Sequence, residues 1–196
     1  MMKRLFPILM LCVPAALWAG CASTPSKFYT LSPASEPGGA TAVYSVAVGP
    51  VSVPAMVDRP QMVVTISPNQ VGMDEFSRWA SPLQNDIARV VAENLVKILG
   101  TPLVSVFPQA TAAGASYRVL IDVMRFESAP GKSATLDAVW TVRGAKEGAS
   151  RAGRTTASEP AADRSTAALV AAHSRALGRL SGQVAEAIRG LERAGK

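Results

Sequence analysis

Two long amphipathic segments most constrain what this chain can fold into, because each carries a single apolar stripe that needs an apolar surface to cover it. The first spans residues 81–100, where we expect Ser81 to cap a helix, Pro82 to take its first position and Gln84 to complete a capping box. The second runs over residues 165–191. The residues at helical spacing are Leu83, Ile87, Val90, Val91, Leu95 and Ile98 in the first segment, and Leu169, His173, Leu177, Leu180, Val184, Ile188 and Leu191 in the second.

A β-sheet is the surface expected to cover these stripes. Gly49-Pro50 bends the first predicted strand, and the proline favours an edge position or a strand end. The order of strands, helix, strands and helix predicts an α/β fold: a mixed sheet of about six to seven strands with two main helices packed on it, in a single domain of residues 43–196. The predicted strands span residues 42–54, 62–67, 71–76, 103–107, 117–126 and 135–144, with a weaker strand near 154–158.

The N-terminal residues are interpreted as a secretory signal rather than as part of the fold. Lys3 and Arg4 precede an apolar run over residues 5–20, which contains two prolines. This run is shorter than the ~20 apolar residues that a spanning helix needs, and no basic cluster follows it. A cleaved signal peptide is therefore the better interpretation.

The end of this run resembles the lipobox of bacterial lipoproteins, where small residues precede a cysteine that is lipidated on sulfur before the signal is cut. Here "AGC" stands at residues 19–21, although Trp18 occupies the position where leucine is usual. We expect a lipoprotein signal peptide over residues 1–20, lipidation of Cys21, and a Pro/Gly/Ser-rich tether within residues 21–42. An ordinary secreted protein and an uncleaved anchor are the alternatives. No aspartate follows the cysteine, which favours the outer membrane with the domain facing the periplasm.

Residue types that carry catalysis or bind metals are scarce in the predicted domain. Cys12 and Cys21 are the two cysteines of the chain, and His173 is its one histidine. Nucleophile-elbow, Walker and zinc-protease motifs do not occur, so we expect no catalytic residues, no metal and no cofactor. A hydrolase that uses Asp122 and Asp137 as paired carboxylates is the enzymatic alternative, and a polar sheet face is the simpler interpretation of both. The formal net charge is +6 without basic stripes interleaved with aromatic residues, so nucleic acid is not expected as a partner.

Several stretches, taken in order, are similar to one known family. They are "FYTL" (28–31), "VAVGPVSVPAMVDRPQMV" (46–63), "RWASPL" (78–83), "YRVLIDVMRF" (117–126) and a strand containing Trp140. Together they resemble the ABC-type transport auxiliary lipoproteins, the PqiC/YmbA family. The pair formed by "DRPQ" and "RWASPL" is its more specific part. Ser81 departs from the family, which often has glutamate there.

The resemblance implies a role rather than a reaction. It implies an outer-membrane lipoprotein that serves an Mce-type ABC system, which moves lipid between the two membranes and supports membrane integrity. The implied partners are an Mce-domain tunnel protein and the associated ABC transporter subunits, together with further copies of the chain in a homo-oligomer such as a ring. Cys21 matches the lipidated cysteine. The positions that match the family motifs, as partner contacts or as determinants of the fold, are Asp58, Arg59, Pro60, Gln61, Arg78, Trp79 and Pro82. A stand-alone lipid- or metabolite-binding lipoprotein is the alternative.

Overall fold

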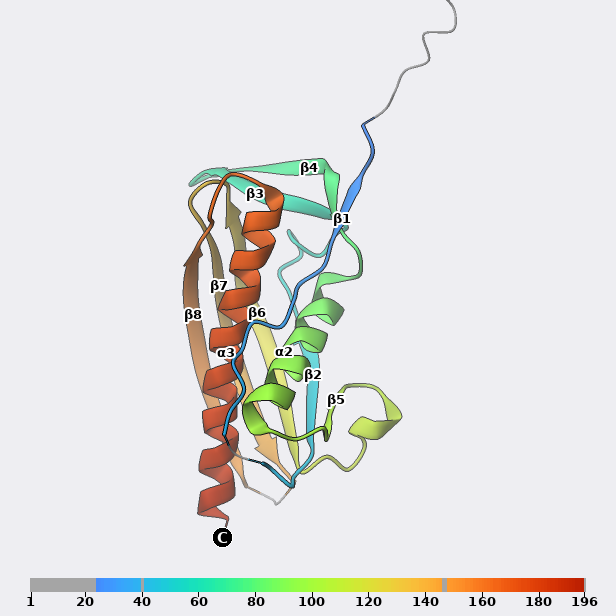
Figure 1. Cartoon of the computed structure of the whole chain (residues 1–196), viewed down its shortest axis with the longest axis vertical. Helices are drawn as coiled ribbons and strands as arrows, with labels where there is room; N and C mark the ends of the chain where they lie inside the picture. The colour runs from blue at the N-terminus through green and yellow to red at the C-terminus, as the bar shows by residue number, and fades with distance from the viewer. Residues whose placement is uncertain (1–23, 40, 146–147, 196) are drawn as a thin grey trace, which may run out of the picture.

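The computed structural model describes residues 24–39, 41–145 and 148–195, so the predicted signal peptide and Cys21 lie outside the described residues. Two helices pack on two sheets in a single domain (Figure 1), which confirms the predicted α/β class. The elements are β1 (Lys27–Tyr29), β2 (Val46–Ser52), β3 (Gln61–Ser67), β4 (Gln70–Trp79), α2 (Leu83–Leu99), β5 (Val104–Val106), the 3-10 turn η2 (Ala110–Ala112), β6 (Tyr117–Ala129), β7 (Ser133–Gly144), β8 (Ser150–Pro160) and α3 (Thr166–Ala194).

The larger sheet has the strand order β5-β2-β6-β7-β8 and carries the core. β2 runs parallel to β5 and β6, whereas β6, β7 and β8 are antiparallel. Alternate residues of β7 are buried on one face: Leu136, Ala138, Trp140 and Val142. The helices α2 and α3 lie side by side over this face (Figure 1), and their apolar stripes complete the core. Among the residues that the structure describes, no helix packs on the opposite face of this sheet.

The proline in β2 occupies an interruption of the strand ladder. β2 is an inner strand, but β5 pairs only with its first three residues, Val46 to Val48. On the other side, the register with β6 shifts between Val48 and Val51. Pro50 lies in this gap, where its missing N–H does not break a regular ladder.

A second, smaller sheet was not predicted. β1, β4 and β3 form it in that order, with β1 parallel to β4 and β3 paired with β4 as a hairpin. The hairpin lies across one end of the molecule (Figure 1). Because β3 and β4 hydrogen-bond to each other, the hairpin forms without pairing with the larger sheet. "FYTL", which was not expected to be a strand, supplies Phe28 and Tyr29, two of the three residues of β1.

Both helices begin close to their predicted starts, but only α3 has a side chain that caps it. Ser165 caps α3, and its side chain accepts the N–H of Ala168 at 3.1 Å. The cap predicted for α2 is wrong: its N-cap is Pro82, and no side chain caps it. The carbonyl of Pro82 instead accepts the N–H groups of Asn85 and Asp86, so the helix starts one residue late and the capping box with Gln84 does not form.

The described part of residues 30–42 does not form the free tether that its composition predicted. This segment, called the strap below, runs along the groove between α2 and α3 (Figure 1). Leu31 is buried at its start, and at its end the N–H of Ala42 donates to the carbonyl oxygen of Leu99 at 3.0 Å. The strap therefore belongs to the folded domain.

Two buried polar side chains of α2 hold the strap in place. Asn94 Oδ1 accepts the N–H groups of Ala34 and Ser35 at 3.0 and 3.1 Å, and Asp86 Oδ2 accepts the N–H of Leu31 at 2.7 Å. An unpaired buried N–H group costs ~1–3 kcal/mol, so these acceptors explain why a Pro/Gly/Ser-rich segment is ordered here. They come from a distant part of the sequence, which is why composition alone suggested a tether.

Candidate functional site

The two predicted motifs meet at the base of the β3–β4 hairpin. The N–H of Trp79, at the end of β4, donates to the carbonyl oxygen of Pro60 at 2.8 Å, and the N–H of Ala80 donates to that of Tyr29 at the same distance. The loop before β3, the end of β4 and β1 are thus tied together. They border a cleft of about 290 Å³, called the motif cleft below, which is lined by Asp58, Arg59, Pro60, Trp79, Ala80, Ser81 and Pro82.

Trp79 and Pro82 serve mainly the fold. The indole of Trp79 is 6% exposed and meets the ring of Phe126 edge-to-face, with 6.1 Å between ring centroids. Such pairs favour the edge-to-face arrangement because the positive ring edge faces the negative ring face. Pro82 sets the start of α2. Both residues form the rigid wall of the motif cleft.

Gln61 and Arg78 lie beside the cleft and stabilise an irregular part of β4. They are cross-strand neighbours, but the next pair in the register is Met62 with Asp74, so three residues of β4 bulge out. Gln61 Nε2 lies 3.3 Å from Glu75 Oε2, and Arg78 Nε donates to the Glu75 carbonyl oxygen at 3.0 Å. These contacts fix the bulge that directs Trp79 into the core.

Asp58 and Arg59 are the charged motif residues that are exposed, together with Pro60 and Pro82. Arg59 Nη1 lies 3.0 Å from Met73 Sδ, so its side chain reaches over the hairpin. The cleft therefore combines an apolar wall with one anionic and one cationic group at its rim. Ligand pockets commonly enclose ~300–1,000 Å³, so a cleft of about 290 Å³ suits one side chain of a partner better than a whole lipid.

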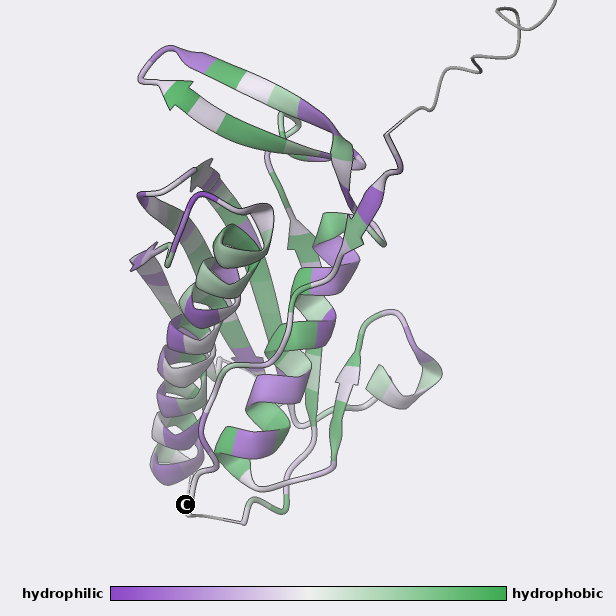
Figure 2. Cartoon of the chain, turned by 45° about the horizontal axis from the view of Figure 1, so that its top comes forward, coloured by the Kyte–Doolittle hydropathy of each residue, from purple (hydrophilic) through white to green (hydrophobic). Residues whose placement is uncertain are grey.

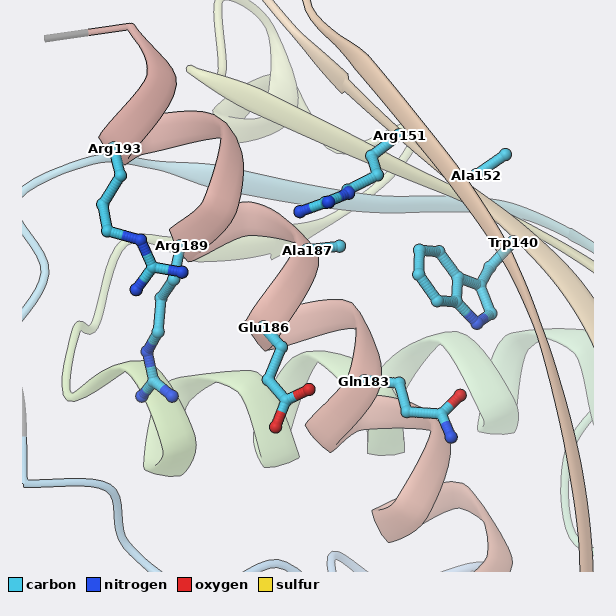
Figure 3. A pocket seen from close by; sticks show the side chains of 8 residues that line it. All are labelled: Trp140, Arg151, Ala152, Gln183, Glu186, Ala187, Arg189 and Arg193. Atoms are coloured by element: carbon cyan, nitrogen blue, oxygen red, sulfur yellow. The ribbon is translucent and has the colours of Figure 1, made fainter.

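A larger groove lies between α3 and the strands β7 and β8 (Figure 3). It encloses about 750 Å³ and is lined by Trp140, Arg151, Ala152, Gln183, Glu186, Ala187, Arg189 and Arg193. Arg151 reaches from β8 toward α3 (Figure 3), and the absence of a side chain at Gly190 leaves room for its guanidinium. Arg189 donates to the carbonyl oxygen of Ile98 at 2.7 Å, which ties α3 to α2. Sequence analysis did not identify this groove.

His173 has a structural position. It is fully buried on α3, stacks on Phe126 with 3.7 Å between ring centroids, and its Nε2 lies 2.9 Å from Ser128 Oγ. Burial lowers the pKa of His173 to about 3, so the ring is neutral at physiological pH. A neutral imidazole without access to solvent does not exchange protons with a substrate.

The paired-carboxylate interpretation is wrong. In the β6–β7 register Asp122 lies opposite Val139, whereas Asp137 lies opposite Arg125. Arg154 donates to both carboxylate oxygens of Asp137, at 2.8 and 2.6 Å, and this lowers the pKa of Asp137. Asp137 is therefore a charged group that lies on the sheet beneath Arg154, only 4% exposed, and not a proton donor. Within the described ranges, no cluster of three or more His, Cys, Asp or Glu side chains could hold a metal ion.

These features define a small α/β domain whose sequence motifs build a surface cleft rather than a reaction centre. The chain belongs to the family of ABC-type transport auxiliary lipoprotein components, whose model matches residues 29–185. This match confirms the resemblance to the PqiC/YmbA-type lipoproteins. It also includes most of the strap, in agreement with its place in the fold.

Solved structures agree with this fold. The crystal structure of a DUF330-family protein from Xanthomonas campestris superposes with a TM-score of 0.69 at 20% identity, covering 87% of this chain and 100% of that chain. A second crystal structure, of an uncharacterized protein, gives 0.69 at 16% identity, with coverages of 84% and 99%. A PelC dodecamer from Paraburkholderia phytofirmans gives 0.37 at 17% identity, with coverages of 83% and 94%. A search of curated proteins finds no match. No helix among the described residues is both long and apolar enough to cross a membrane.

Proposed function

We propose that this chain is an outer-membrane lipoprotein, anchored through Cys21, that acts as a non-enzymatic docking subunit of an Mce-type ABC lipid-transport system. The family match over residues 29–185 is the observation that carries this proposal, because the family consists of auxiliary components of ABC-type transport. The lipobox-like residues 19–21 support the anchor, and the missing aspartate after Cys21 supports the outer membrane. In this role the chain links the transport machinery to the membrane and thereby supports membrane integrity.

The motif cleft is the proposed contact with the partner. Its wall is fixed by buried contacts of Trp79, whereas Asp58 and Arg59 at the rim are free to meet a protein surface. Arginine beside an aromatic wall is a frequent composition of interface centres. The expected partner is an Mce-domain tunnel protein or an associated ABC subunit.

A homo-oligomer is proposed as the assembled form. The helix-free face of the larger sheet exposes two large apolar residues, Met124 at 56% and Val139 at 37%, among charged neighbours. Light scattering of the purified lipoprotein should give a mass of several subunits. A monomer at micromolar concentration would contradict this part of the proposal.

Co-purification tests the function. A tagged chain should recover Mce-domain or ABC subunits from crosslinked envelope membranes, and the recovery should fall strongly for Arg59→Glu. Arg143→Glu, which reverses an exposed charge on the other sheet, is the matched control and should recover the partner normally. If the wild-type chain recovers none of these subunits, the docking role is wrong.

The anchor is tested separately. Cys21→Ser should abolish labelling with radioactive fatty acid and leave the precursor uncut by signal peptidase II. Normal processing of that variant would contradict the lipobox interpretation without bearing on the docking surface.

A further inference from the structure

The β3–β4 hairpin is the part of the domain where exposed apolar side chains gather. Ile66, Val71, Met73 and Phe76 on the hairpin are 44–59% exposed. Phe28 on the neighbouring β1 is 66% exposed. Figure 2 shows the hairpin projecting from the body, with one strand mainly apolar and the other a mixture of apolar and polar residues. These side chains occupy both faces of the hairpin: Val71 and Met73 share one face of β4, whereas Ile66 lies beside Val64 and Gly72 on the other. Exposed apolar side chains gathered on one projecting element mark a place that contacts another molecule or a membrane.

The position of the lipid-bearing residue indicates what covers this surface. Lys27, the first residue of β1, is six positions after Cys21 in the sequence. Fully extended, they span at most ~20 Å. β1 pairs directly with β4 of the hairpin, so an anchor on Cys21 keeps the hairpin within reach of the membrane surface.

Charges beside the hairpin fit a lipid surface as well. A cleft of about 650 Å³ lies between β3 and the β6–β7 turn, where the apolar residues Val64 and Ile66 face the exposed cations Lys132 and Arg164. Gly131 has a φ of +71° and no Cβ, and this leaves room for the Arg164 side chain to lie across the turn. Apolar contact flanked by Lys and Arg is the composition that binds anionic phospholipid surfaces.

Three acidic groups near this surface already have partners. Asp74 accepts the N–H groups of Phe76 and Ser77 at 3.0 Å each, and Glu75 lies 3.7 Å from the guanidinium of Arg78. Asp163 accepts the N–H of Ser165 at 2.7 Å. These contacts leave the cations beside the hairpin to meet lipid phosphates.

We propose that the β3–β4 hairpin rests in the surface of the membrane that holds Cys21, with its apolar side chains among the lipids and with Lys132 and Arg164 on anionic headgroups. This rests on the proposed lipid anchor, and it adds a second, non-covalent membrane contact. The contact fixes the orientation of the domain, so the motif cleft at the base of the hairpin faces along the membrane rather than away from it.

Depth-dependent fluorescence quenching tests this in the full lipidated protein. The folded domain has no cysteine, so Ile66→Cys can be labelled with an environment-sensitive dye at the hairpin. Ser150→Cys, at the start of β8 near the opposite end, is the matched label. In vesicles of phosphatidylethanolamine and phosphatidylglycerol with nitroxide-labelled acyl chains, the Ile66 label should shift to the blue and be quenched, whereas the Ser150 label should stay aqueous.

Charge substitutions separate a lipid contact from mere proximity. Val71 and Met73 lie on one face of β4, and Val71→Asp with Met73→Asp should remove the quenching at the Ile66 label. Val139→Asp on the larger sheet is the control and should keep it. Replacing phosphatidylglycerol by phosphatidylcholine should reduce the quenching, through Lys132 and Arg164. All variants should keep the wild-type circular dichroism.

Flotation of the same vesicles tests the lipid anchor on Cys21 separately from the hairpin contact with the membrane. Protein that floats through Cys21 with an aqueous, unquenched Ile66 label would overturn the hairpin contact and leave the anchor intact. Quenching that appears only when a partner protein is added would also overturn it, because the occupant would then be a protein. Protein that does not float would overturn the anchor and the hairpin contact together.

Discussion

The strap and the hairpin end differ in how far the rest of the chain covers them. In the strap, the N–H groups of Leu31, Ala34 and Ser35 donate to the buried side chains of Asp86 and Asn94 on α2. The hairpin end, which comprises β1, β3, β4 and the motif cleft, leaves large apolar side chains in solvent. This difference shows that the groove between α2 and α3 is covered by the strap, which belongs to the same chain. The hairpin end remains available for other molecules.

The largest expected effect comes from Trp79, where the hairpin end is joined to the core. Trp79→Ala removes a nearly buried indole and its contact with Phe126, so it should lower the free energy of unfolding by about 3–5 kcal/mol. Urea denaturation followed by circular dichroism measures this. Arg59→Ala, on the exposed rim of the same cleft, should stay within about 0.5 kcal/mol of wild type. Equal losses for the two variants would mean that the cleft has no rigid wall.

Asn94 tests whether the strap is part of the domain. Asn94→Ala leaves the N–H groups of Ala34 and Ser35 without their acceptor, which should cost about 3 kcal/mol in unfolding free energy. Asn85→Ala makes the same change at an exposed position of α2 and should cost less than about 0.5 kcal/mol. Similar values for both variants would show that the strap is a loose tether.

The burial of His173 predicts that the domain loses stability as the pH falls. Burial lowers the pKa of His173 from the ordinary 6.5 of an exposed histidine to about 3 in the folded protein. The unfolded chain therefore binds the proton first as the pH falls below 6.5, and stability declines until about pH 3. Between pH 6.5 and 5 the loss should be about 2 kcal/mol. The unfolding temperature should fall with pH across this range in the wild type, and this pH dependence should be much weaker in His173→Gln. An unchanged slope would contradict the buried, neutral state of the ring.

The hairpin should tolerate polar substitutions that a core strand does not. Met73 is 55% exposed, so Met73→Ser should change the unfolding free energy by no more than about 0.5 kcal/mol. Val119→Ser in β6, where the side chain is fully buried, is the contrast and should cost several times more. Comparable losses would mean that the hairpin surface is covered within the monomer.

Sequence periodicity predicted the elements with strong patterns, and physical reasons explain the others. The stripes from Leu83 to Ile98 and from Leu169 to Leu191 predicted both helices, because helical spacing is a local property. The three residues of β1 carry no alternation, so neither β1 nor the second sheet could be predicted. The strap was misinterpreted because Asp86 and Asn94, its acceptors, are distant in the sequence.

The candidate site was only partly accessible to sequence analysis. The family resemblance selected the residues around Pro60 and Trp79, but spacing does not show that their backbones are hydrogen-bonded. It also could not separate the exposed Asp58 and Arg59 from Gln61 and Arg78, which stabilise the bulge of β4. The arginine-lined groove on α3 was missed because Arg151 and Arg189 belong to different elements.

Site-specific photocrosslinking in intact cells tests most directly whether the hairpin end docks a transport partner while the strap side stays closed. A photoreactive residue would replace Arg59 on the motif cleft, or Glu36 on the exposed side of the strap. The account predicts an adduct with an Mce-domain or ABC subunit at position 59 and none at position 36. An adduct only at position 36, or equal adducts at both positions, would contradict it.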